Sequence, residues 1–219
     1  MLKDGEKGAI IQKGKETYAI APHVKCGVVT PDDLRKLADV AEKYDATALK
    51  ITSAARIAIV GLKEEDIDNV WNELDMPAGH AVGLCVRSIK TCPGTTFCKL
   101  GKQDSLSMGM KLDGIYHGMN VPSKMKMAVS GCKIQCGENC IKDLSMYGTK
   151  DGWTVLVGGM GGTAPRLADV LIEGLSTEEA EEMIQKVTTY YKENSKKERI
   201  GKMVDRMGGI EALKEAVLN

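Results

Sequence analysis

The chain has 219 residues, and its 30 Lys and Arg balance its 30 Asp and Glu, so the formal net charge is zero. A protein that binds nucleic acid usually carries a basic excess, which is absent here. No apolar run approaches the roughly 20 residues that span a bilayer, and the first residues lack the apolar core of a signal peptide. We therefore expect a cytoplasmic protein that binds neither nucleic acid nor membrane.

The first part of the chain predicts a small unit of strands and helices in the order β-α-β-β-α. Thr30 and Pro31 begin the first helix, with Thr30 as the N-cap and Pro31 in the first turn. This order resembles one ferredoxin-like half unit. The predicted strands cover residues 17–21, 48–52 and 56–60, and the predicted helices cover residues 31–44 and 63–74.

The segment 76–80 is the best candidate for a domain boundary, because the character of the sequence changes after it. Residues 85–140 hold six of the seven cysteines and show little clean periodicity. The elements predicted beyond the boundary are a strand at 126–130, a hairpin of 146–147 with 153–157 around Asp151-Gly152, a long helix from a capping box at Ser176, and two short helices after 196 that break at Gly208-Gly209.

Four cysteines form two pairs with a spacing that suggests metal binding. Five residues separate Cys92 from Cys98, and three separate Cys132 from Cys136. Cysteines clustered in a cytosolic chain bind metal more often than they form disulfides. Four thiolates from two loops can surround a 4Fe–4S cluster, and a four-cysteine zinc site stays open as an alternative.

The other three cysteines have different expected roles. Cys26 and Cys85 are expected to be small buried hydrophobic residues. Cys140, four residues after Cys136, could be a structural thiol or an alternative ligand.

Several segments, in order along nearly the whole chain, resemble the sulfite and nitrite reductases, and most of all their small single-repeat, assimilatory-type members. The cysteine segments 91–98 and 130–138 resemble the cluster motif of that family. The other similar segments are 50–57, 122–129, 153–165 with its glycine run, 198–201 and 205–208.

The resemblance implies an α+β fold. A ferredoxin-like half domain on the substrate side, residues 1–76, would precede a mixed α/β domain that binds sirohaem and a 4Fe–4S cluster, residues 77–219. It also implies six-electron reduction of sulfite to sulfide or of nitrite to ammonia. The implied cluster ligands are Cys92, Cys98, Cys132 and Cys136, and Cys136 would also bridge to the sirohaem iron.

The substrate is an anion whose reduction consumes protons, so cations should face it. The resemblance assigns this role to Lys124 and Lys126, which alternate along a predicted strand and share one face. It assigns a similar role to Arg56, two residues after Ala54 on the same predicted strand face, and to His23, where relatives usually have arginine. The alternatives are a solvated strand edge for the lysines, a surface ion pair for Arg56 and a structural histidine.

Sirohaem carries eight carboxylates, which need basic side chains and backbone N–H groups. Consecutive glycines can present such N–H groups to anions, although a glycine run can also be only a flexible turn. The residues implied for this role are Arg87, Lys90, Lys133, Arg166, Gly158, Gly159, Gly161 and Gly162.

No dinucleotide-binding glycine motif opens a helix after a predicted strand, so a ferredoxin or a flavoprotein is expected to supply electrons.

Typical family members contain two copies of this unit, and this chain has one. Lys126 would lie on the order of 20 Å from Cys132 along an extended strand, so either a homodimer shares the site or a monomer bends to build it alone. The alternatives from other classes are an iron–sulfur electron-transfer protein without sirohaem and a zinc-stabilised structural module.

Overall fold

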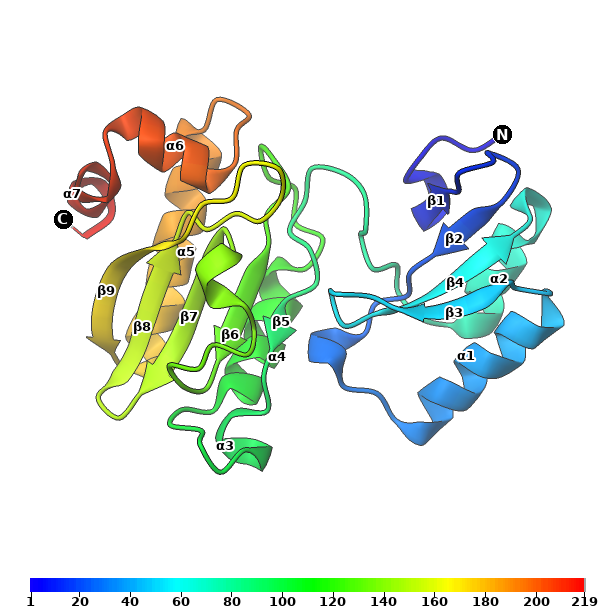
Figure 1. Cartoon of the computed structure of the whole chain (residues 1–219), viewed down its shortest axis with the longest axis horizontal. Coiled ribbons are helices and arrows are strands. Elements are labelled where there is room, and N and C mark those ends of the chain that lie inside the picture. The colour runs from blue at the N-terminus through cyan, green and yellow to red at the C-terminus, as the bar shows by residue number, and fades with distance from the viewer. Residues whose placement is uncertain (219) are drawn as a thin grey trace. The chain divides into compact units, whose positions relative to one another are not determined.

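The computed structural model describes residues 1–218, and the chain divides into two compact units, Met1–Gly83 and Leu84–Asn219 (Figure 1). Each unit contains helices and a sheet, so the predicted α+β class is confirmed. The domain limit between residues 76 and 77 stays a prediction. Each unit is described by itself below.

The first unit contains a four-stranded antiparallel sheet in the order β1-β2-β4-β3. The three predicted strands are confirmed, and β1 was not predicted because three residues are too few to show a period. The strands are β1 (Ala9–Ile11), β2 (Tyr18–Ile20), β3 (Ala48–Ile51) and β4 (Ile57–Leu62).

Two helices pack with this sheet around one apolar core. Helix α1 (Pro31–Lys43) begins as predicted, since the Thr30 hydroxyl accepts from the Asp33 N–H and the Asp33 carboxylate accepts from the Thr30 N–H. The predicted helix 63–74 starts as a 3-10 turn, η3 (Glu64–Asp66), and continues as α2 (Ile67–Leu74). The core includes Ile20, Leu37, Val40, Ile59, Leu62, Ile67, Val70 and Leu74.

The second unit contains a five-stranded mixed sheet in the order β5-β6-β7-β8-β9. Strands β5, β6 and β7 run parallel to one another, whereas β8 and β9 are antiparallel to their neighbours. The strands are β5 (Lys90–Thr91), β6 (Met127–Ser130), β7 (Leu144–Thr149), β8 (Gly152–Val157) and β9 (Asp169–Leu175).

Three predictions are confirmed in this unit: the hairpin, the long helix and the two C-terminal helices. No helix among the described residues is long and apolar enough to cross a membrane. Helix α4 was missed because it is buried on more than one side and shows no single apolar stripe. The helices are α3 (Gly94–Phe97), α4 (Ser105–Tyr116), α5 (Thr177–Asn194), α6 (Ile200–Met207) and α7 (Ile210–Leu218).

The mixed sheet has one apolar face and one face of small and polar residues. Met127 and Val129 point into the core that α4 and α5 cover, as the strand period of two requires. Ala128 and Ser130 point to the opposite face, where η4 (Asn139–Ile141) lies over β6 and β7 (Figure 1). This second face is therefore the one that the cysteine segment crosses.

The carboxyl ends of β5 and β6 meet at one edge of the sheet because the two strands are parallel. Thr91 pairs with Val129, so Cys92 and Gly131 leave the sheet side by side. A Cβ on Gly131 would lie 2.7 Å from Gly94 Cα and 2.8 Å from the Gln103 carbonyl oxygen, so only glycine permits this approach. The two cysteine loops thus touch through backbone.

We predict that Gly131→Ala destabilises the second unit by about 1–3 kcal/mol, because the added methyl group forces the two loops apart. Denaturant unfolding measures the change. Gly14→Ala is the control, since a Cβ there meets no atom within 4 Å. Equal stability of the two variants would contradict the close approach.

Candidate metal centre and anion site

Cys92 receives the hydrogen bonds that favour a thiolate. The Gly131 N–H donates to Cys92 Sγ at 3.1 Å, and the Ser105 hydroxyl lies 3.3 Å from the same sulfur. Burial would raise the pKa of the Cys92 thiol, but hydrogen bonds from Ser105, Gly131 and Gly94 outweigh it, so the pKa falls below its ordinary value. A thiolate is the form that binds iron.

The second cysteine pair lies on the crossover between the parallel strands β6 and β7, residues 131–143. Its path is fixed by Asn139, a fully buried side chain. The Asn139 amide donates to the Met146 carbonyl at 2.6 Å and accepts from the Ser130 hydroxyl at 2.6 Å, and that hydroxyl accepts from the Gly137 N–H at 2.9 Å. These bonds hold the loop flat on the sheet and leave Cys136 and Cys140 exposed.

The cysteines fit an iron–sulfur cluster better than a single zinc ion. A zinc ion with tetrahedral Zn–S bonds of about 2.3 Å holds its sulfurs about 3.8 Å apart. Within residues 1–218, no three cysteine sulfurs lie within 4.8 Å of one another. A cube of four irons, with one thiolate per iron, accepts sulfurs that lie farther apart than this. Cys26 and Cys85 are buried, as predicted.

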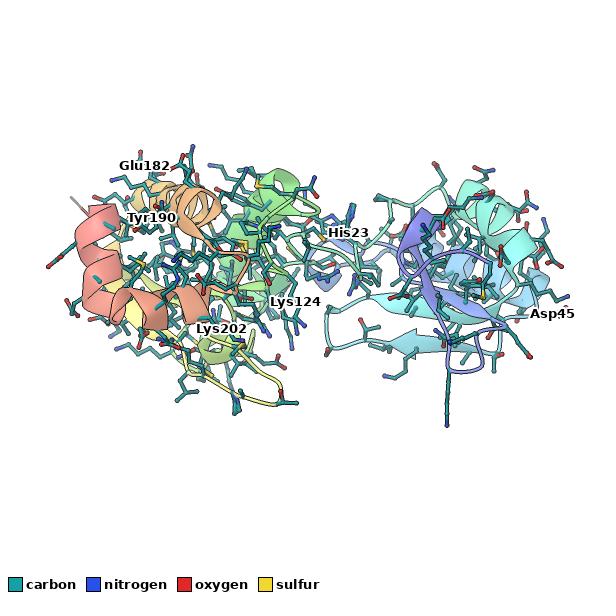
Figure 2. All side chains as sticks on the ribbon, turned by 90° about the horizontal axis from the view of Figure 1, so that it is seen from above. His23, Asp45, Lys124, Glu182, Tyr190 and Lys202 are labelled. Atoms are coloured by element: carbon teal, nitrogen blue, oxygen red, sulfur yellow. The ribbon has the colours of Figure 1, made fainter. Side chains whose placement is uncertain are left out.

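Lys124 and Lys126 lie in the segment just before β6, which begins at Met127, so they are not on a strand as predicted, although their exposure alternates with that of Met125. Both are exposed, and Met125 between them is fully buried (Figure 2 labels Lys124). Arg87 joins them, because its N–H donates to the Met125 carbonyl at 2.9 Å and the parallel bridge between Val86 and Met125 sets it beside Lys126.

The surroundings of Lys126 are strongly cationic. Desolvation and the charges of Lys142, Arg199 and Lys124 lower its pKa, and Asp143 opposes them. Asp143 fixes the position of this lysine, since its carboxylate accepts from the Lys126 N–H at 2.7 Å and pairs with Arg199 at 2.6 Å and 2.8 Å.

A second carboxylate gathers two lysines beside Cys136. Glu138 pairs with Lys90 at 2.7 Å and with Lys142 at 2.9 Å. Hydrogen bonds from these two lysines lower the pKa of Glu138 to about 2. Lys90, expected to meet a sirohaem carboxylate, therefore already faces an anionic group at the cysteine loop.

The glycine run follows β8 and packs on the cysteine crossover. A Cβ on Gly159 would lie 2.6 Å from the Lys142 carbonyl oxygen and 2.7 Å from the Cys140 carbonyl oxygen. Gly158 donates its N–H to the Asp143 carbonyl at 2.8 Å, while Gly161 and Gly162 have open space or ordinary contacts around them. The structure thus brings the glycine run to Cys140 and Asp143.

Arg166 holds this run in place. Its guanidinium pairs with Asp169 at 2.6 Å and Asp205 at 3.0 Å and donates to the Gly158 carbonyl at 3.1 Å. Its sirohaem role stays a prediction. Lys133 is exposed and borders a cavity beside Cys132.

In the first unit, Arg56 is not on a strand. The prediction that Ala54 and Arg56 share a strand face is wrong, because both belong to the β3–β4 turn, in which the Thr52 N–H donates to the Arg56 carbonyl at 2.8 Å. The Arg56 side chain is only 7% exposed and donates to the Gly79 carbonyl.

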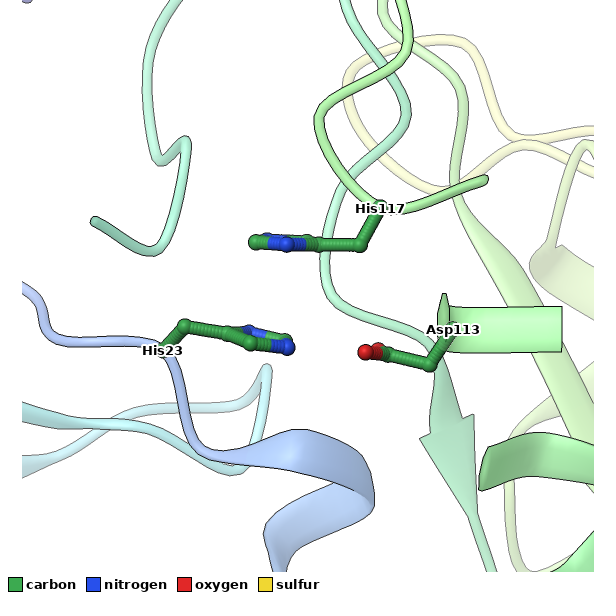
Figure 3. Close-up of side chains that lie close together, drawn as sticks. All are labelled: His23, Asp113 and His117. Atoms are coloured by element: carbon green, nitrogen blue, oxygen red, sulfur yellow. The ribbon is translucent and has the colours of Figure 1, made fainter. Parts of the chain in front are cut away.

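His23 is half-buried on the loop after β2, and its N–H donates to the Pro77 carbonyl at 2.8 Å. Figure 3 shows this loop in the first unit. It also shows Asp113 and His117, which lie four residues apart at the end of α4 in the second unit. Asp113 is buried and accepts from the Ile89 N–H at 3.4 Å.

Sequence reasoning missed the residues that support the site. Ser105, Asn139, Lys142 and Asp143 carry no metal-ligand or catalytic motif of their own. The only available signal was that three of them follow Cys136 within the crossover.

Comparisons with known proteins agree with this geometry. The family described as "Nitrite and sulphite reductase 4Fe-4S domain" matches residues 82–219, and the "Nitrite/Sulfite reductase ferredoxin-like half domain" matches residues 10–77. The chain is 46% identical over 218 residues to an assimilatory-type sulfite reductase of Nitratidesulfovibrio vulgaris, covering 99% of this chain and 100% of the relative. It is 42% identical to a nitrite reductase [NAD(P)H] of Bacillus subtilis, covering 88% of this chain but only 24% of that protein.

Two solved structures share the fold, each with a TM-score of 0.82. The NirA protein of Mycobacterium tuberculosis is 20% identical and is matched over 96% of this chain and 44% of its own. A dissimilatory sulfite reductase I is 15% identical and is matched over 93% of this chain and 69% of its own. The chain therefore belongs to the nitrite and sulfite reductase family, and it is an oxidoreductase whose cofactors are a 4Fe–4S cluster and sirohaem.

Proposed function

We propose that the protein reduces sulfite to sulfide or nitrite to ammonia, with electrons from a ferredoxin or a flavoprotein in the cytoplasm. The cluster and sirohaem supply the six-electron redox chemistry when bound. Cys92, Cys98, Cys132 and Cys136 would hold the cluster, and Cys136 would also be a ligand of the sirohaem iron. The exposed side chain of Cys136 and the backbone fit of its loop support these roles.

The single observation that carries the proposal is that the cysteine crossover and the cationic group share one face of one sheet. A Cβ on Gly137 would lie 3.3 Å from Ala128 Cβ, which places the chain after Cys136 over the middle of β6. Lys126 is two residues from Ala128, about 7 Å along an extended chain, and points to the same side.

The cations have separate tasks in this proposal. Lys124 and Lys126 hold the substrate anion and deliver protons to it, since both are exposed and the lowered pKa of Lys126 eases release of its proton. Arg87 and Lys133 bind sirohaem carboxylates. The glycine run, which Arg166 holds in place, offers its backbone N–H groups to the same cofactor. For Arg56 and His23, the predicted role toward the substrate anion rests on the family resemblance alone.

The direct test of this function is turnover with reduced methyl viologen, which replaces the natural electron donor. We expect consumption of viologen on addition of sulfite or nitrite, with sulfide or ammonia as product. Absence of turnover in protein with full cofactor content would contradict the proposal.

We predict that replacing any of the four cluster cysteines by serine lowers iron and acid-labile sulfide together, because each iron needs its own thiolate. Cys140→Ser is the matched control on the same loop and should leave the iron content unchanged. A full cluster in Cys98→Ser, or a large loss in Cys140→Ser, would mean that Cys140 replaces Cys98 as the ligand.

A second prediction concerns pH. The pKa of Lys126 is lowered, so its charge, and with it the affinity for the anion, is lost as pH rises through a value below that of an ordinary lysine. Lys126→Arg keeps the charge and should move the alkaline limb of the kcat/KM profile to higher pH. Lys202→Arg, on exposed α6 surface, should leave the profile unchanged. An unmoved limb in Lys126→Arg would remove Lys126 from the anion site.

We also propose that one chain completes its own site, because the crossover returns along β6 toward Lys126. Mixing Cys136→Ser chains with Lys126→Ala chains should restore no activity, and the protein should sediment as a monomer. Restored activity in the mixture would show instead that a homodimer shares the site.

A further inference from the structure

A cavity of about 440 Å³ borders the carboxyl end of β6 in the second unit. Three segments form it: the loop after α3, the start of the cysteine crossover, and the β7–β8 hairpin. Of the four predicted cluster ligands only Cys132 lines it, so the groove lies beside the proposed cluster site rather than at it. The side chains that matter are Leu100, Lys102, Cys132, Lys133, Ile134 and Lys150.

Two large aliphatic side chains that line the groove are exposed. Ile134 is 62% exposed and Leu100 is 47% exposed. Apolar side chains gathered in a polar rim mark surfaces that a partner covers. The neighbouring position of Cys132 means that such a partner would come close to the cluster.

The rim of the groove is cationic. Lys102, Lys133 and Lys150 are all exposed, and Asp151 is the one acidic residue of the lining. Within residues 1–218 none of these three lysines takes part in an ion pair, whereas Lys90, Lys111, Lys142 and Lys214 of the same unit are each paired with a glutamate. Lys133 is the lysine proposed above for a sirohaem carboxylate, so Lys102 and Lys150 supply the unneutralised positive charge of the rim, on a chain whose net charge is zero.

We propose that this groove docks an acidic one-electron donor protein, with Ile134 and Leu100 as the apolar floor and Lys102 and Lys150 as the charges that attract it. This rests on the proposed reductase function. Complementary charge steers such an encounter, and a small apolar contact keeps it short-lived. In each encounter the donor loses one electron and the cluster gains it beside Cys132. Six encounters, with protons taken from solvent, supply one turnover.

The test measures binding, so it does not depend on turnover. The probe is an oxidised, acidic 4Fe–4S ferredoxin, titrated calorimetrically against the cofactor-loaded protein at low and high ionic strength. Wild-type protein should bind it at low ionic strength and lose affinity as salt screens the charges. In the Lys102→Glu/Lys150→Glu variant we expect Kd to rise about tenfold or more, because attraction becomes repulsion.

A matched control carries the same charge change elsewhere. Lys186 and Lys202 are exposed on α5 and α6, so Lys186→Glu/Lys202→Glu should keep the wild-type Kd. Ile134→Ser should raise Kd at both ionic strengths, since it removes apolar contact and no charge. Viologen-driven turnover should be unchanged in all three variants, which separates failure of docking from failure of the proposed function.

Three results would overturn the proposal. The groove variant could bind ferredoxin as wild type does, or the control variant could weaken binding equally. Alternatively, the groove variant could change the mass of the protein in sedimentation without changing Kd for ferredoxin, which would make the groove an interface between copies of this chain.

Discussion

The parallel pairing of β5 with β6 is the constraint on which the metal centre depends. Parallel neighbours end at the same edge of a sheet, so the segments that follow them must begin side by side. The register of Thr91 with Val129 sets Cys92 next to Gly131, and the absence of a side chain on Gly131 lets the loops touch. A ligand set drawn from residues 92–98 and 132–136 is therefore a consequence of strand topology.

The two faces of the mixed sheet have different roles: one packs into the core that stabilises the fold, and the other carries the residues of the proposed site. Met127 and Val129 belong to the core under α4 and α5, and their substitution by polar residues would affect folding first. The opposite face carries Lys126, Ala128 and Ser130, and the crossover lies over it through Asn139 and Gly137. The cysteine crossover, the lysines and the glycine run lie on this face, because they precede or follow β6, β7 and β8, which are neighbouring strands of one sheet.

Much of this arrangement could be predicted from the sequence, for physical reasons. Thr30 and Ser176 cap their helices through local contacts that any such sequence would make. The alternating exposure of Lys124, Met125 and Lys126 follows from the period of two in an extended chain. Short elements such as β1 and β5 could not be predicted, since two or three residues show no period and their pairing depends on distant partners. Arg56 was predicted to lie on a strand, but it lies in the turn, one residue before β4 begins. A sequence pattern does not fix a strand boundary to a single residue.

Sequence reasoning left open whether a homodimer shares the site or a monomer bends to build it alone. It did not foresee that the crossover folds back along β6, because that path depends on Asn139, whose partners Ser130 and Met146 lie on two different strands. Tertiary hydrogen bonds of this kind leave no local pattern. The same holds for Asp143 and Arg199, which are 56 residues apart and form one buried ion pair.

The visible absorption spectrum of the purified protein, read with its iron and labile sulfide content, tests the central claim most directly. Two adjacent cysteine loops beside a cationic face predict a tetrapyrrole Soret band and a red band superimposed on cluster absorption. A broad brown shoulder without these bands would show a cluster alone, and a colourless protein that contains zinc would contradict the account.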